Sequence, residues 1–121
     1  MVWGPGTFGY SPLGLQAFRA TQCPGINPSK VRFDTDHHGR FGGDNFMEGN
    51  LDTHMISAFG MNVSTLVSNT NASLSTEEGD GFGLALLDFV TGLANRAVVP
   101  HVLSLSLGSL SAYSCDLLCA E

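Results

Sequence analysis

Two carboxylates one helical turn apart, Glu48 and Asp52, have the clearest capacity for chemistry in this chain. In a helix, residues four apart lie on one face, and the large apolar side chains of the segment 48–59 fall on that face too. We therefore expect both acids to face the interior. Inward carboxylates at this spacing repel each other and lose hydration, so they must share a proton or find partners. Such pairs often act as acid–base groups.

The same segment predicts which side of the helix meets solvent. The side expected inside carries Leu51, Met55, Ile56 and Phe59, whereas the side expected outside carries Gly49, Asn50, Thr53, His54 and Ser57. A simpler structural explanation stays open. Glu48 lies near the helix start, where the helix dipole favours an acid, and Asp52 could pair with a base such as Arg40.

Other candidate sites are weaker. The run from Asp34 to Gly39 copies the opening of an EF-hand loop, but its fifth residue is His38 and its twelfth is Asn45, where the motif requires other side chains. His37 and His38 could meet His54 at zinc, although adjacent histidines in a glycine-rich loop are more often solvated. We therefore expect no metal ligands and no cofactor-binding residues in this chain.

The stretch from Gly4 to Gly9 satisfies the spacing G-x-G-x-x-G literally. A dinucleotide site of this type needs a strand before it and a helix directly after it. No strand is predicted before Gly4, and Pro5 interrupts the motif. The stretch is therefore predicted to be a turn.

Helices and strands alternate along the chain. Helices are predicted over residues 11–20, 48–59 and 81–95, the last apolar nearly all round and therefore buried. Strands are predicted over 30–36, 62–68 and 98–108, and residues 69–80 read as an exposed polar loop. This alternation predicts an α/β fold in which the strands near Val31, Val63 and Leu103 lie parallel in one sheet flanked by helices.

Composition excludes several classes of function. Five basic and eleven acidic residues give a net charge of −6, which excludes an electrostatic surface for nucleic acid. The longest mainly apolar stretch, 82–94, is shorter than the roughly 20 residues of a membrane span. No signal peptide is recognisable. Cys23, Cys115 and Cys119 are too few and odd in number for a disulfide framework.

Three segments in order resemble the sedolisin family of serine-carboxyl peptidases, which includes the tripeptidyl peptidases. These segments are Tyr10–Phe18, Glu48–Asp52 with the Thr-His-Met-Ile-Ser-Ala that follows, and Pro100–Gly108. The E-x-x-L-D motif is the most specific of them. The resemblance implies a partial subtilisin-like fold, with residues 1–121 as an incomplete amino-terminal fragment of one peptidase domain.

The family resemblance also implies roles for the two acids. Glu48 would be the general base that takes a proton from a serine nucleophile, and Asp52 would hydrogen-bond and tune Glu48. A carboxylate can act as a base at acidic pH, where a histidine would already be protonated. The substrate would be a peptide or polypeptide, cleaved through an acyl-enzyme.

Several family features are missing from the chain. The S-G-T-S segment with the serine, the S-G-D-S-G segment with the oxyanion aspartate and the calcium site of the full domain are all absent, and Leu107 stands where the family usually has Tyr. We therefore expect this chain alone to be inactive, and to associate with the rest of the domain or with a larger assembly. The alternative is a non-catalytic sedolisin-like subunit with a structural or binding role.

The resemblance implies an extracellular, lysosomal or vacuolar location for the protein. The tripeptides beginning at Asn62 and Asn71 have the form of glycosylation acceptors. In a secreted protein, Asn71 would be the preferred acceptor because it falls in the predicted exposed loop.

Overall fold

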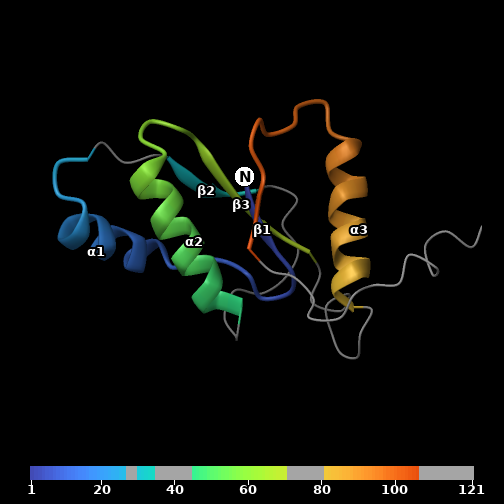
Figure 1. Ribbon diagram of the computed structural model, residues 1–121, viewed down its shortest axis with the longest axis horizontal. Coiled ribbons are helices and arrows are strands. Elements are labelled where there is room, and N and C mark those ends of the chain that lie inside the picture. Colours follow the sequence, from blue (N-terminus) through green and yellow to red (C-terminus); the bar gives the residue numbers. More distant parts are fainter. Residues whose placement is uncertain (27–29, 35–44, 71–80, 107–121) are drawn as a thin grey trace, which may run out of the picture.

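The computed structural model describes residues 1–26, 30–34, 45–70 and 81–106 (Figure 1). The described elements are, in chain order, β1 (Val2–Gly4), α1 (Pro12–Gln22), β2 (Val31–Phe33), α2 (Asn45–Phe59), β3 (Thr65–Asn69), α3 (Gly81–Ala94) and β4 (Ser104–Leu105). Residues 107–121, with Cys115 and Cys119, lie outside the described residues, and Cys23 is a free thiol.

The described strands form one parallel sheet in the order β2-β3-β1-β4. The register places Val67 of β3 beside Phe33 of β2 on one side and Val2 of β1 on the other. Val2 in turn lies beside Ser104 of β4. The predicted α/β fold with a parallel sheet is therefore confirmed.

The central strand β1 is one that the sequence did not predict. Val2 and Trp3 are almost fully buried, because β1 has a strand on each edge and helices on both faces of the sheet. A three-residue strand followed at once by Gly-Pro-Gly is too short to show an alternating pattern, and its turn signal dominates. The expectation that no strand precedes Gly4 is therefore wrong.

The hydrophobic core has two parts, one on each face of the sheet. On the first face, Val2 and Val67 pack with Phe8, with Leu15 of α1 and with Ile56 of α2. On the second face, Met1 and Trp3 pack with Ala85 and Phe89 of α3. Helices α1 and α2 thus share one face, and α3 covers the other (Figure 1).

The connection through α2 has an unusual hand. From β1 the chain runs through α1 past β3 to β2, and it returns through α2 to β3 on the same face of the sheet. Two crossovers that run in opposite directions over one face have opposite hands. The α3 connection runs past β1 over the other face, so it shares the hand of the α1 connection. The α2 connection therefore has the opposite hand to the other two connections, whereas about 98% of such crossovers share one hand.

Helix α1 begins as its sequence predicts. Ser11 is the N-cap, and its Oγ accepts a hydrogen bond from the Gly14 amide at 3.1 Å. Pro12 occupies the first turn, where its missing N–H costs nothing. These two residues set the start of α1 within a residue of the predicted position.

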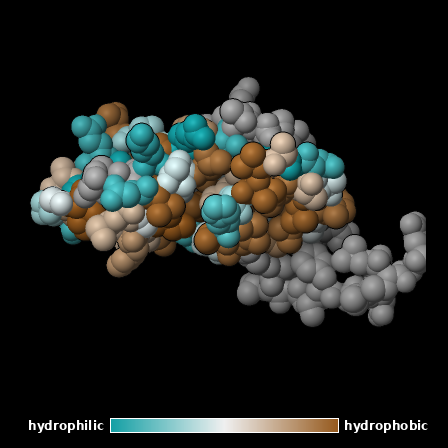
Figure 2. All heavy atoms as spheres, turned by 90° about the horizontal axis from the view of Figure 1, so that it is seen from above, coloured by the Kyte–Doolittle hydropathy of each residue, from teal (hydrophilic) through white to brown (hydrophobic). Residues whose placement is uncertain are grey.

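Helix α3 departs from the prediction of a helix buried all round. Phe89 is buried and stacks on Trp3 at 4.7 Å between ring centroids, but Leu84, Leu87 and Val90 are exposed. Only one side of α3 meets the sheet, so the opposite side stays in solvent. After α3, the connection to β4 exposes Val98, Val99 and Val102, and Figure 2 shows apolar side chains gathered at this end.

The strands differ in extent from the prediction, because β4 begins at Ser104 and not at residue 98, and both ends of β3 are shifted. Strand β3 begins at Thr65, so Val63 lies before it and is exposed. Asn69, expected in a surface loop, ends β3 and is buried, with its Nδ2 donating to the carbonyls of Gly6 and Phe8 at 3.1 and 3.0 Å. The rest of that loop, 71–80, lies outside the described residues.

None of the described helices is long and apolar enough to cross a membrane.

Candidate functional site

Helix α2 places Glu48 and Asp52 one turn apart near its amino-terminal end. Glu48 lies in the first turn, where the helix dipole favours a negative charge. Both residues are half-buried. They therefore stand together on the flank of α2 and not in the protein interior.

The orientation predicted for α2 is reversed in the structure. Gly49, Thr53 and Ser57, expected in solvent, face the protein and are buried. The large apolar residues expected inside are mostly exposed instead, with Leu51 at 50%, Met55 at 42% and Phe59 at 84%. Ile56 alone of the predicted inner residues packs against the core.

The reason for the reversal is a close backbone contact. A Cβ atom added to Gly49 would overlap the carbonyl oxygen of Gly9. Only glycine allows α2 to lie this close to the loop after β1. The small side chains of Thr53 and Ser57 continue the same approach along the helix, and larger residues on this side would hold α2 away from the sheet.

Two polar residues of α2 face α1 and not solvent. The Asn50 Oδ1 accepts a hydrogen bond from the Ser11 amide at 2.8 Å, which ties α2 to the start of α1. The His54 ring stacks on Phe18, with 4.6 Å between centroids and 10° between planes. These contacts fix the rotation of α2 about its own axis, and with it the positions of Glu48 and Asp52.

The surroundings of His54 favour its neutral form. Burial lowers the pKa of His54, and the positive charge of Arg19 lowers it further. Its Nε2 is buried and has no hydrogen-bond partner within the described residues. His54 is therefore a packing residue of the α1–α2 interface, and its proposed zinc partners, His37 and His38, lie outside the described residues.

Asp52 has an unused hydrogen-bonding atom. Its Oδ2 is buried and finds no partner in the part of the chain that the structure describes. An unsatisfied buried acceptor is costly, so this oxygen is suited to take a donor from another group. Arg40, the base suggested for Asp52, lies outside the described residues.

Asp34, the first residue of the EF-hand-like run, forms an ion pair with a basic side chain. Asp34 is buried and forms an ion pair with Arg96, with 2.5 Å between Oδ2 and Nη2. Asp36, His37 and His38 lie outside the described residues. Within residues 1–26, 30–34, 45–70 and 81–106, no group of three metal-binding side chains comes together.

The space over the glycines of the loop with the G-x-G-x-x-G spacing is filled by a side chain of the same loop, that of Phe8. Phe8 is fully buried and lies over Gly4, where an added Cβ would overlap the Phe8 ring. Helix α1 begins only at Pro12. The space that a pyrophosphate would need above the glycines is thus occupied by Phe8, and the dinucleotide interpretation fails although a strand precedes the motif.

A cleft that no sequence pattern indicated lies between β3 and α3. It has a volume of about 220 Å³ and is lined by Ser68, Asn69, Thr70, Asp88, Phe89, Gly92, Leu93 and Arg96. The Thr70 Oγ1 is buried and lacks a hydrogen-bond partner among the described residues. The only hints in the sequence are the polar end of β3 and a glycine within α3.

Comparison of the chain with protein-family models, curated proteins and solved structures finds no match.

Proposed function

We propose that the chain is part of a sedolisin-like serine-carboxyl peptidase that hydrolyses peptide bonds at acidic pH. Glu48 is the general base and Asp52 is the residue that tunes it. The serine nucleophile and the oxyanion aspartate are supplied by residues outside this chain.

The observation that carries the proposal is the pair of half-buried carboxylates on one flank of α2, with Asp52 Oδ2 lacking a partner among the described residues. The parallel α/β sheet and the order of the three resembling segments also support it. Asn50, between the two acids, is hydrogen-bonded to Ser11. This bond holds the first turns of α2 in place, as a positioned general base requires.

The proposed chemistry follows from this placement. Glu48 accepts the proton of a serine hydroxyl as the serine oxygen attacks the scissile carbonyl, and it returns the proton to the leaving amine. Water then attacks the acyl-enzyme with the same base assisting. In this mechanism the carboxylic acid form of Asp52 donates a hydrogen bond to the Glu48 carboxylate and holds it in position. An oxyanion donor commonly stabilises the transition state by about 3 kcal/mol. Because the 121-residue chain lacks both this donor and the serine nucleophile in the proposed mechanism, it is expected to be inert.

A second function, a non-catalytic subunit of a larger assembly, is favoured by a different observation. The exposed apolar side chains of α2 lie beside the two acids. A row of this kind is typical of a surface that meets another protein. The full transcript separates the two functions. A downstream S-G-T-S segment supports the peptidase, and a true stop codon after Glu121 supports the subunit.

The test of the peptidase is peptide hydrolysis by the full-length protein as a function of pH. Glu48→Gln should reduce the rate at acidic pH by orders of magnitude with little change in unfolding temperature. Asp52→Asn should reduce the rate less and shift the pH optimum, because it perturbs the base without removing it. Asp88→Asn, which changes an exposed acid on α3, is the matched control and should keep wild-type activity.

Wild-type activity in Glu48→Gln would refute the role of the base. Peptidase activity in the isolated 121-residue chain would refute the claim that half of the site lies elsewhere.

A further inference from the structure

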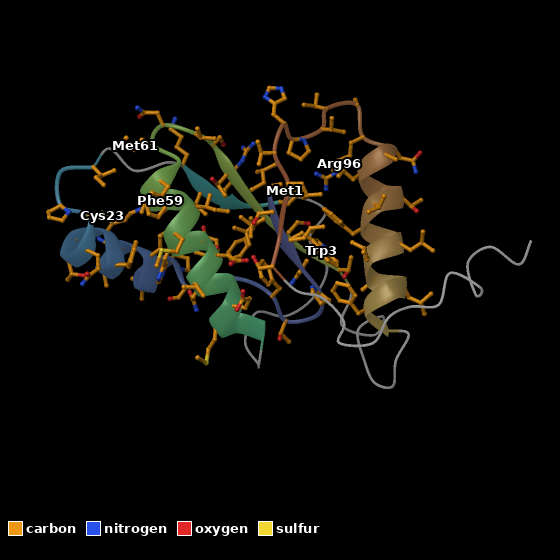
Figure 3. The ribbon with its side chains drawn as sticks, in the orientation of Figure 1. Met1, Trp3, Cys23, Phe59, Met61 and Arg96 are labelled. Carbon is orange, nitrogen blue, oxygen red and sulfur yellow. The ribbon has the colours of Figure 1, made fainter. Side chains whose placement is uncertain are left out.

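Helix α2 exposes a continuous apolar ridge, called here the outer stripe and made up of Met47, Leu51, Met55 and Phe59. Figure 3 shows Phe59 at its carboxyl-terminal end. These residues are spaced four apart and cover about 18 Å of helix. Soluble monomers rarely leave a contiguous apolar surface of this kind in solvent without a function.

The outer stripe cannot be buried by a simple rotation of α2. The backbone of Gly49 lies against Gly9, so no side chain fits on that side of the helix. Asn50 is bonded to Ser11 and His54 is stacked on Phe18, which hold α2 from the side of α1. The stripe therefore faces away from the described part of the fold.

The charges beside the stripe indicate the chemistry of its partner. Glu48 and Asp52 follow one side of the stripe, and α2 carries no Lys or Arg. The whole chain has a net charge of −6. A complementary surface thus combines apolar residues with positive charge.

Three other occupants fit less well. A second copy would bring together two chains of charge −6, and two α2 helices supply acids without bases. The chain's own residues 107–121 contain Asp116 and Glu121 but no Lys or Arg. An anionic membrane surface repels acidic proteins, since such membranes attract basic segments.

We propose that the outer stripe is the docking site for an amphipathic helix of a separate, basic protein. The apolar ridge of that helix lies on the outer stripe, and its Lys or Arg side chains lie beside Glu48 and Asp52. Ridges of residues four apart pack at about −50°, so the two helices cross and do not run side by side. This proposal rests on the second proposed function, the non-catalytic subunit, because a basic helix beside Glu48 and Asp52 would block the approach of a serine to Glu48.

The test is to measure, by fluorescence anisotropy, the binding of a designed helical peptide to the 121-residue chain. The peptide has about 18 residues, which gives about 27 Å of helix, with Leu at every fourth position and Lys on both flanks. A matched peptide carries Glu in place of Lys. The chain should bind the Lys peptide at least about tenfold more tightly than the Glu peptide.

Variants of the chain locate the site. Met55→Asp should weaken binding of the Lys peptide at least about tenfold, as for a central contact residue. The matched control is Leu87→Asp, an apolar residue of similar exposure on α3, and it should bind as wild type. Glu48→Lys combined with Asp52→Lys should reverse the preference toward the Glu peptide. Circular dichroism should show all variants folded, because the altered side chains are partly or largely in solvent.

The proposal is overturned if neither peptide binds at about 1 mM, or if Met55→Asp binds the Lys peptide as well as wild type does. It is also overturned if wild type forms a dimer that Met55→Asp dissolves, because a second copy then covers the stripe. Binding of wild type, but not of Met55→Asp, to phosphatidylcholine vesicles would likewise replace the protein partner with a lipid surface. Since no arm of the experiment measures hydrolysis, its failure is distinct from failure of the peptidase function.

Discussion

The backbone of Gly49 in α2 lies against the backbone of Gly9, with no room between them for a methyl group. This contact decides which side of α2 faces the sheet. It turns Thr53 and Ser57 inward and leaves Leu51 and Met55 in solvent. Glu48 and Asp52 consequently lie on the flank of the helix, next to the exposed apolar residues.

Replacing Gly49 should therefore destabilise the protein. In Gly49→Ala the added Cβ meets backbone atoms that cannot move alone, and we expect a loss of about 1–3 kcal/mol in the free energy of unfolding. Gly92→Ala is the matched control, because a Cβ there meets nothing within 4 Å. Since alanine favours a helix, Gly92→Ala should be neutral or stabilise by up to about 1 kcal/mol. Urea unfolding of both variants measures the difference, and equal stabilities would contradict the close contact.

The stability of the protein should fall at mildly acidic pH because of His54. Its pKa is lowered in the folded protein, so the unfolded chain takes up the proton first as the pH falls. The contribution of His54 is thus complete above about pH 6.5 and is lost below it. His54→Phe keeps an aromatic ring against Phe18 but cannot be protonated, so it should show a smaller loss between about pH 7 and pH 5.

The control for this pH dependence is His101→Gln, which alters an exposed histidine and should lose stability as wild type does. Urea midpoints measured across the same pH range decide the matter. An unchanged acid profile in His54→Phe would assign the loss to other groups.

The ion pair between Asp34 and Arg96 should be needed for stability. Arg96→Met leaves a buried carboxylate without this partner, which typically costs about 3–5 kcal/mol. The double variant Asp34→Asn with Arg96→Met removes both charges, and it should recover a substantial part of that loss. A double-mutant cycle from thermal or urea unfolding measures the coupling, and strictly additive effects would show that the two side chains do not interact.

The stack of Trp3 on Phe89 should carry much of the packing between α3 and the sheet. Phe89→Ala removes a buried aromatic ring, and losses of about 3–5 kcal/mol are usual for this change. Leu87→Ala, on the exposed side of α3, should change stability by less than about 0.5 kcal/mol. If both variants unfold at the same urea concentration, α3 does not depend on this contact.

Much of the fold could be predicted from local sequence signals. Ser11 and Pro12 mark the start of α1, because an N-cap hydroxyl and an N-terminal proline act within one turn. The alternation of helical and strand-like segments predicts the parallel sheet, since parallel strands need long crossovers. The shared face of Glu48 and Asp52 also follows from the helical period alone.

Other features were decided only by the tertiary structure. β1 is too short to show a pattern, and it is a strand because β3 and β4 pair with its two edges. Asp34 and Arg96 are 62 residues apart, so no local signal could join them. The orientation of α2 depends on Gly9, which lies in another part of the chain. Hydrophobic periodicity identifies the two sides of a helix, but the closest backbone approach determined which side faces the sheet, and the apolar side stayed in solvent.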